Sequence, residues 1–173
     1  MLKEMIHGAI EYNYAVADSL ITKIDPASLD WKPETGTNWL TVRQLLFHIS
    51  NACGSSIKGF VTGDWGLPED FDMEKMTPEE MLPPAEAFPG VDSIEQARAL
   101  LAEDKATALE MLATVDEERL VGAMTPAPWD SMEFPLGVRL LQMVDHLKQH
   151  KGQLFYYLKL QGHEVNTGDL YGA

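Results

Sequence analysis

The sequence predicts an all-α protein, a four-helix bundle that occupies residues 1–173 as a single domain. Two observations lead to this prediction. Four segments repeat apolar side chains with a period close to 3.6, whereas no two segments alternate as paired strands do. A chain of 173 residues is also long enough to bury one substantial core. Four amphipathic helices of similar length bury their apolar stripes most simply against one another.

The first predicted helix covers residues 2–24. Its apolar stripe consists of Leu2, Met5, Ile6, Ala9, Ile10, Tyr14, Val16, Ala17, Leu20 and Ile21. The pair Asp25-Pro26 ends it, because a residue that precedes proline is pushed out of the α region. We therefore expect the chain to turn at this pair.

The second predicted helix has the clearest start in the chain. Thr41 and Gln44 are spaced as a capping box, in which each side chain satisfies a backbone N–H group that the first turn leaves unpaired. The helix is expected to run without interruption from Val42 to about Val61. Gly63 can then end it, because glycine readily takes the left-handed conformation that follows many helices.

A long acidic, proline-rich connection is expected between the second and third helices. Residues 64–91 hold five of the ten prolines and eight acidic residues, against one lysine. The segment is too long for a tight turn between antiparallel neighbours. It therefore allows the third helix to run in the same direction as the second, and the sequence leaves open whether the connection is ordered.

The third and fourth helices complete the bundle. The third covers roughly residues 93–115, and either Asp92 with Glu95 or Ser93 with Gln96 can cap its start. The link TPAPWDSMEFP that follows contains three prolines, which act as breakers. The fourth helix spans about residues 136–161, and Gly162 stands where a C-terminal glycine is expected.

Charge and composition exclude several classes of partner. The formal net charge is −14, and such a surface repels nucleic-acid phosphates and anionic lipid head groups. No apolar run is long enough to cross a bilayer. The first residues lack the layout of a signal peptide, and the single cysteine, Cys53, excludes an internal disulfide. These features predict a cytoplasmic protein with no nucleic-acid or membrane partner.

Two histidines four residues apart are the strongest sign of a site. His146 and His150 lie on one face of the fourth helix, one turn apart, at the spacing that helical metal sites use. Leu147 replaces the glutamate of an H-E-x-x-H motif, so zinc-protease chemistry is disfavoured. Gln153 and Tyr157 continue the same polar stripe. The stripe either lines a cavity inside the bundle, because buried polar groups need partners, or faces water at an edge.

His48 is the candidate for a third ligand. It lies in the apolar stretch LLFHIS of the second helix, where a histidine can also be a satisfied core residue. Neighbouring helices of a bundle lie about 8–10 Å apart, so His48 can reach the pair on the fourth helix. Three neutral imidazoles suit zinc or another late first-row ion and leave a coordination position open. Asn51 can face the same cavity or simply pack, whereas Cys53 points elsewhere and is expected to be buried and inert.

The sequence resembles the DinB-like (YfiT-like) family of four-helix-bundle metalloproteins. The resemblance covers nearly the whole chain. Three stretches support it, namely DWKPETGTNW at residues 30–39, GTNWLTVRQLLFHIS at residues 36–50 and DHLKQHKGQLFYYLKLQG at residues 145–162. Their order and spacing are more specific than any one of them alone. The long acidic segment departs from the simplest members of the family.

The resemblance implies a set of functional expectations. The family's three metal ligands correspond to His48, His146 and His150, and the ion is usually zinc or nickel. The helices are expected to follow an up-down-down-up order, and a homodimer and a role in stress response are implied. Characterised relatives include transferases that attach low-molecular-weight thiols, such as bacillithiol, to electrophiles, and a mycothiol-dependent isomerase, whereas many relatives have no known activity.

The functional hypothesis is therefore a divalent-metal-dependent enzyme that acts on a small molecule. Transfer of a low-molecular-weight thiol to an electrophile is the first choice, because the sequence offers no clear general base and a metal ion deprotonates a bound thiol outright. No catalytic side chain beyond the ligands is identified. Metal-dependent hydrolysis is the first alternative, and a non-catalytic metal- or ligand-binding dimeric scaffold is the second.

Overall fold

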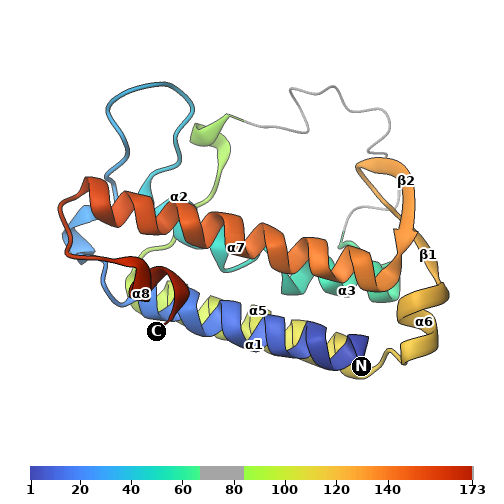
Figure 1. Cartoon of the computed structure of the whole chain (residues 1–173). Coiled ribbons are helices and arrows are strands. Elements are labelled where there is room, and N and C mark those ends of the chain that lie inside the picture. The colour runs from blue at the N-terminus through green and yellow to red at the C-terminus, as the bar shows by residue number, and fades with distance from the viewer. Residues whose placement is uncertain (67–83, 173) are drawn as a thin grey trace.

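The computed structural model describes residues 1–66 and 84–172, without the side chains of residues 130 and 131. The described part is mostly helical, which confirms the predicted all-α class (Figure 1). Its helices are α1 Leu2–Ile21, α2 Val42–Ile49, α3 Gly54–Thr62, α5 Ile94–Ala113, α6 Glu117–Gly122, α7 Leu136–Leu160 and α8 Thr167–Tyr171. Short 3-10 turns span Pro26–Ser28 and Ala85–Ala87, and the strands are β1 Met124–Ala127 and β2 Asp130–Pro135.

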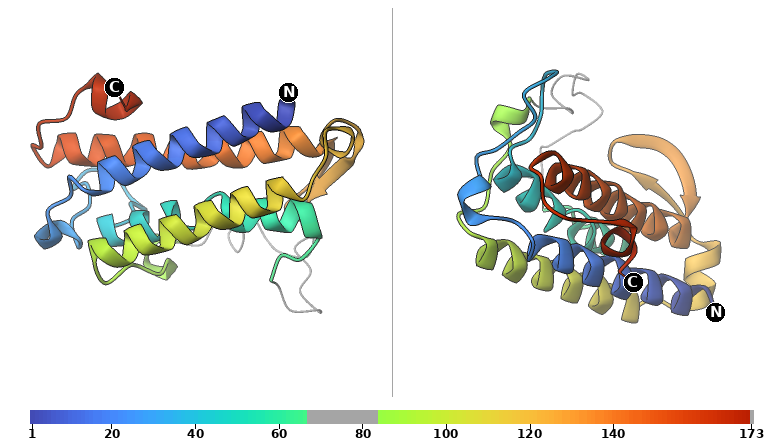
Figure 2. Two further views of the ribbon diagram at one scale, coloured as in Figure 1. Left: turned by 90° about the horizontal axis from the view of Figure 1, so that it is seen from below. Right: turned by 60° about the vertical axis from the view of Figure 1, so that its left-hand side comes forward.

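The long helices pack side by side around one core. α1 contacts both α5 and α7, α3 contacts the same two helices from the other side, and α2 lies against α7 (Figures 1 and 2). α1 and α7 begin at the same end of the molecule, beside α6 and the strands. The full up-down-down-up order stays a prediction from the family resemblance. The predicted connection over residues 64–91 falls largely on residues 67–83, which lie outside the described part.

The second predicted helix is interrupted, so the expectation of one helix from Val42 to Val61 is wrong. The capping box of Thr41 and Gln44 is present, and Gly63 ends the segment with a φ of 78°. Between these ends, however, α2 stops at Ile49 and α3 begins only at Gly54. The break brings the backbone of α3 so close to α5 that only a glycine fits at residue 54. A tertiary contact therefore overrides the local helical pattern.

A β-hairpin replaces the predicted irregular link before α7, so the expectation of no strand pair is also wrong. β1 and β2 pair antiparallel, with Met124 opposite Pro135 and Thr125 opposite Phe134. In a two-stranded ribbon both strands are edges, where proline is tolerated because its missing N–H need not face a partner. Arg139 of α7 holds the hairpin, since its Nε donates to the Thr125 carbonyl over 3.0 Å.

The remaining helix ends differ from the predictions by a few residues. α1 stops at Ile21 rather than at residue 24, and α5 and α7 are shorter than predicted by one to two residues at an end. Ser93, one of the two proposed caps, accepts the Gln96 backbone N–H over 3.1 Å. Gly162 follows α7 with a φ of 84°, as the glycine signal predicts. A side-chain cap thus marks the start of α5, and a glycine follows the end of α7.

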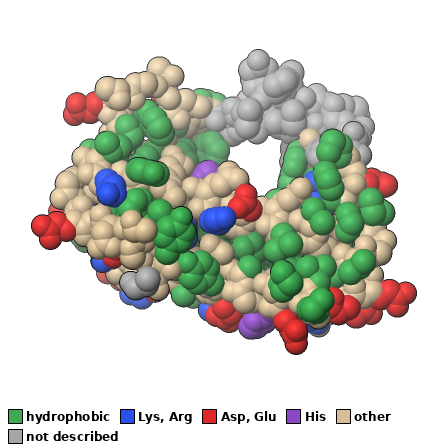
Figure 3. All heavy atoms as spheres, in the orientation of Figure 1, with side chains coloured by type: hydrophobic (Ala, Val, Ile, Leu, Met, Phe, Trp, Pro, Cys, Tyr) green, Lys and Arg blue, Asp and Glu red, His purple; other side chains and the backbone are tan. Residues whose placement is uncertain are grey.

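The surface combines acidic residues with several exposed apolar side chains. Hydrophobic side chains gather at the end that carries the hairpin and the start of α7, and acidic ones lie along the lower edge of this face (Figure 3). The exposed apolar residues at that end include Met124, Trp129, Met132, Val138 and Leu141. None of the described helices combines the length and apolarity that crossing a bilayer requires.

Candidate metal centre

Three histidines from two helices converge on one point. The Nε2 atom of His48 lies 3.3 Å from that of His146 and 3.0 Å from that of His150. The Nε2 atoms of His146 and His150 are themselves 3.0 Å apart. Among the described residues, these three histidines form the one cluster of at least three potential ligand side chains that could hold a metal ion. The structure therefore brings together the three histidines that the sequence indicated as candidate metal ligands.

The local structure of α2 places His48 in the last turn of a short helix. The capping box fixes the start of α2, and the Gln44 side chain then donates to the carbonyls of Ala85 (2.7 Å) and Phe88 (3.0 Å). These bonds hold the segment before α5 against α2. The Phe88 ring consequently meets the His48 imidazole edge to face, with 5.8 Å between centroids. One side of the histidine cluster is thus closed by an aromatic ring.

His146 is oriented by a backbone carbonyl in the break between α2 and α3. Its Nδ1 atom lies 3.1 Å from the carbonyl oxygen of Ala52. A carbonyl can only accept a hydrogen bond, so Nδ1 carries the proton in the neutral ring. The Nε2 atom is then left with its lone pair, directed at the other two histidines. In an uninterrupted helix the Ala52 carbonyl would accept a backbone N–H of the next turn. The break between α2 and α3 leaves this carbonyl available to His146.

His150 is oriented by a chain of hydrogen bonds that ends on a backbone carbonyl. The Tyr157 hydroxyl donates to the Leu40 carbonyl over 2.9 Å and accepts from Gln153 Nε2 over 3.3 Å. This fixes the orientation of the Gln153 amide and turns its Oε1 toward His150 Nδ1, 3.1 Å away. The Nδ1 atom therefore carries the proton, and Nε2 again presents a lone pair.

The donor set fits a late first-row divalent ion. Two lone pairs only 3.0 Å apart repel each other unless an electropositive species lies between them. With metal–nitrogen bonds of about 2.05 Å, separations of 3.0–3.3 Å correspond to N–metal–N angles of about 94° to 107°. These angles lie between the octahedral and tetrahedral values. Three neutral imidazoles are also the chemistry that zinc and nickel accept.

Burial favours the uncharged form of two of the three rings, those of His48 and His150. Burial, together with the neighbouring His150 and His146, lowers the pKa of His48 to about 4. Burial also lowers the pKa of His150, although its bond to Gln153 opposes the change. Metal ligation requires the neutral imidazole. The site is therefore ready to accept a cation at neutral pH without first releasing protons from these two rings.

A pocket of about 560 Å³ borders the cluster on the side of His146. This volume lies within the range of small-molecule sites. The described residues that line it are Ser56, Trp129, Arg139, Gln142, Met143, His146 and Gln149. None of them carries a carboxylate. The pocket therefore gives a small molecule access to His146, and its walls combine apolar, hydrogen-bonding and cationic side chains.

The sequence predicted that Asn51, Gln153 and Tyr157 line a cavity at the site. Asn51 is exposed and donates to the Phe47 carbonyl over 2.9 Å. Gln153 and Tyr157 face the cluster but act through the hydrogen bonds to His150, and Tyr157 is only 2% exposed. None of these three side chains is among the described residues that border the pocket, so their role as lining residues stays untested.

Sequence reasoning missed the hairpin wall of the pocket. Trp129 lies at the hairpin turn, and its indole meets Phe60 and Trp65 edge to face. The available signal was an aromatic residue within the proline-rich link, where prolines indicated breakers rather than paired strands. The contact between the Ala52 carbonyl and His146 could not be predicted from the sequence, because it involves the backbone of a helix break and no particular side chain.

Cys53 does not take part in the site as a nucleophile. It is fully buried, as predicted, and burial raises the pKa of its thiol to about 12. A thiol is nucleophilic as the thiolate, which is absent near neutral pH at such a pKa. Any thiol chemistry at this site must therefore use a thiol from outside the chain.

Comparison with known proteins identifies a family. The family model described as the DinB superfamily matches residues 9–154. The matched range contains the three converging histidines, the whole of α2, and α7 as far as residue 154. No curated protein matches the chain.

Proposed function

The chain belongs to the DinB superfamily, and from this premise we propose that it is a divalent-metal-dependent enzyme with His48, His146 and His150 as ligands. The observation that supports this most strongly is the convergence of the three Nε2 atoms beside the 560 Å³ pocket. The neutral tautomers argue for a cation such as zinc or nickel. A site closed by Phe88 on one side and bordered by a pocket on another has the layout of a catalytic centre.

The proposed reaction is transfer of a low-molecular-weight thiol to an electrophile. A divalent ion at this centre would lower the pKa of a thiol ligand, so that the ligand is nucleophilic near neutral pH. The sulfur then forms a bond to the electrophilic carbon, and the leaving group departs with the bonding electron pair. The described lining of the pocket contains no carboxylate that could act as general base. This composition favours a nucleophile that loses its proton on ligation.

The pocket would hold the electrophile next to His146. Trp129 and Met143 supply apolar surface, and the amides of Gln142 and Gln149 can donate or accept hydrogen bonds. The walls exclude part of the surrounding water and keep the two reactants close, which converts a bimolecular step into a nearly unimolecular one. The chain's own contribution is therefore binding and orientation.

Two other functions remain open to the same tests. Metal-dependent hydrolysis would use water in place of the thiol at the same centre. A non-catalytic scaffold would bind a metal or ligand without turnover. The homodimer and the cytoplasmic location predicted from the sequence stay predictions.

The first experiment measures the metal content of the protein after removal of any affinity tag. Elemental mass spectrometry would compare the wild type with His146→Ala and with Gln149→Ala, which changes an exposed residue of the same helix face. We expect about one divalent ion per chain in the wild type and the control, and loss in His146→Ala. No ion in any of them after incubation with zinc, nickel and manganese would overturn the metalloenzyme proposal.

The second experiment separates the three functions. The metal-loaded protein would be mixed with thiol–electrophile pairs, such as cysteine and monobromobimane, and with a nitrophenyl ester. Thiol-dependent product formation that disappears in His146→Ala supports transfer. Ester cleavage without a thiol supports hydrolysis, and inertness toward both supports the scaffold.

A further inference from the structure

A buried carboxylate lies behind the metal centre and belongs to no part of the proposed chemistry. Asp104 projects from α5 and is only 7% exposed. Its Oδ2 accepts the Tyr14 hydroxyl over 2.6 Å and the Gly54 N–H over 2.9 Å, and its Oδ1 accepts the Ser55 N–H over 2.9 Å. It thereby caps the start of α3, which has no side-chain cap of its own. A carboxylate at a helix N-terminus is well placed, because the unpaired N–H groups carry partial positive charge.

The same carboxylate is linked to His146 through one peptide group. The Cys53 N–H points toward Asp104 Oδ2, at 3.4 Å, and the Ala52 carbonyl of the same peptide accepts from His146 Nδ1 at 3.1 Å. In a trans peptide the N–H and the C=O point in opposite directions. One rigid plane therefore has the buried carboxylate on one side and the histidine ring on the other.

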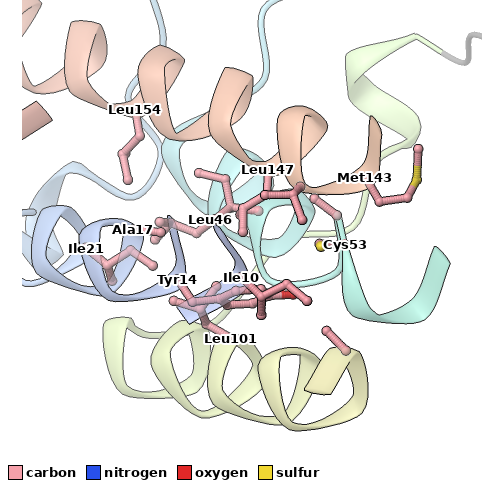
Figure 4. Close-up of a cluster of buried hydrophobic side chains, with 14 of the residues drawn as sticks. Ile10, Tyr14, Ala17, Ile21, Leu46, Cys53, Leu101, Met143, Leu147 and Leu154 are labelled. Atoms are coloured by element: carbon pink, nitrogen blue, oxygen red, sulfur yellow. The ribbon is translucent and has the colours of Figure 1, made fainter. Parts of the chain in front are cut away.

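The approach of α3 to α5 that makes this link possible depends on Gly54. A Cβ atom there would lie 1.9 Å from the Asp104 carbonyl oxygen and 2.7 Å from its Oδ1. A third helix also takes part, because Tyr14 of α1 donates its hydroxyl to the Asp104 carboxylate. Tyr14 lies among the buried side chains near Cys53 (Figure 4). Three helices thus fix the position of one peptide group.

We propose that Asp104 and Tyr14 are positioning residues for the histidine centre, acting on His146 through the peptide group between Ala52 and Cys53. The inference rests on the proposed function only in that the oriented ring serves as a metal ligand. The carboxylate holds the peptide plane at the angle that His146 requires. It also polarises the peptide, which makes the Ala52 carbonyl a stronger acceptor. A strong acceptor at Nδ1 fixes the tautomer and the orientation of the ring.

The affinity test compares Asp104→Asn with a variant that weakens the fold without touching this chain of contacts. Leu112→Ala is suitable, because Leu112 is buried on the same helix about two turns from Asp104. Zinc affinity would be measured by competition with a chromophoric chelator, at a temperature where circular dichroism shows each variant folded. We expect Asp104→Asn to bind zinc about tenfold more weakly and Leu112→Ala to stay within threefold of the wild type. Equal affinities for Asp104→Asn and the wild type within threefold, or an equal loss in both variants, would overturn the proposal.

A second readout needs no metal and uses the milder variant Tyr14→Phe, which leaves the three backbone donors to Asp104 in place. Nitrogen NMR of histidine-labelled, metal-free protein reports which ring nitrogen of His146 carries the proton. We expect the Nδ1–H tautomer in the wild type and a mixture of tautomers in Tyr14→Phe and Asp104→Asn. His150, which Gln153 orients, should keep its tautomer and so provides an internal control.

The two readouts distinguish failure of the inference from failure of the proposed function. If the wild type binds no metal, the proposed function fails, but the NMR comparison still decides whether Asp104 and Tyr14 orient His146. If the His146 tautomer is unchanged in both folded variants, the proposed positioning role is wrong, whatever the metal content. A purely structural role for Asp104 would lower the unfolding temperature and leave the tautomer unchanged.

Discussion

His150 and Gln153, one turn apart on α7, are joined by a 3.1 Å contact between Nδ1 and Oε1. The amide is itself fixed by Tyr157, whose hydroxyl donates to the Leu40 carbonyl. The donor and acceptor of each hydrogen bond in this chain are fixed, because the Leu40 carbonyl at its end can only accept. Gln153 therefore decides which nitrogen of His150 carries the proton, and it leaves Nε2 with a lone pair toward the other histidines.

Replacing Gln153 should weaken metal binding without removing a ligand. In Gln153→Leu the His150 ring loses its acceptor and samples the tautomer whose Nε2 is protonated and cannot ligate. Loss of such a contact typically lowers metal affinity 10–100-fold, and we expect a loss of about this size. Gln153→Glu keeps an acceptor and adds charge, so its affinity should equal or exceed that of the wild type. Isothermal titration with zinc measures both.

Gln149→Leu is the matched control for this prediction. Gln149 lies one turn before Gln153 on α7, and its amide donates to Asp145 rather than to a histidine. The control should bind zinc as tightly as the wild type. A similar loss of affinity in both leucine variants would show that the helix surface matters rather than the contact to His150.

The metal-free protein should lose stability as the pH falls, in part through His48. Burial lowers the folded-state pKa of His48 to about 4, from 6.5 in the unfolded chain. Between these values the unfolded state binds more protons, so the stability present above pH 6.5 is lost as the pH falls toward 4. The contribution is about 2 kcal/mol after allowance for the partial exposure of the ring.

Urea unfolding in the presence of a chelator, at about pH 7 and about pH 4.5, tests this contribution. His48→Asn removes the ionisable group and keeps a polar side chain of similar size. Its unfolding free energy should fall less steeply with pH than that of the wild type. Parallel slopes for the two proteins would mean that protonation of His48 contributes nothing to acid destabilisation.

The helical class and the histidine cluster were predictable because both leave local patterns. The 3.6 period, the capping box at Thr41 and the glycines at 63 and 162 are readable from neighbouring residues alone. The spacing of His146 and His150 likewise follows from one helix. The third histidine required only that α2 face α7, which any bundle with this helix order allows.

The break between α2 and α3 and the hairpin were not predictable, because both depend on distant contacts. Asp104 lies about fifty residues from the N-terminus of α3 that it caps, and no local signal connects them. Arg139 similarly stabilises the hairpin from α7. The prolines of β1 and β2 indicated a loop, and only the pairing of two edge strands makes them acceptable.

Gly54→Ala should destabilise the protein strongly. The added Cβ would meet the Asp104 backbone oxygen at 1.9 Å, and backbone cannot move away as a flexible side chain can. We expect a loss of about 3 kcal/mol or more, although alanine is the better helix former. Gly8→Ala is the control, because a Cβ at this position of α1 meets nothing within 4 Å and should stabilise by about 0.5–1 kcal/mol. Thermal and urea unfolding should show shifts of opposite sign.

Filling the pocket should separate substrate binding from metal binding. Ser56 lies half-buried on α3 and lines the pocket beside His146 without contacting the three Nε2 atoms. A phenylalanine there would occupy space that the proposed electrophile needs, so Ser56→Phe should lower kcat/KM for thiol transfer at least about tenfold, mainly through KM. The metal content should stay at that of the wild type, because the ligand histidines and their hydrogen bonds are untouched. Ser19→Phe, on the exposed side of α1, adds the same ring far from the pocket and should leave both quantities unchanged. Full activity in Ser56→Phe would place the reaction outside this pocket, and loss of metal together with activity would mean that the substitution disturbs the histidine centre itself.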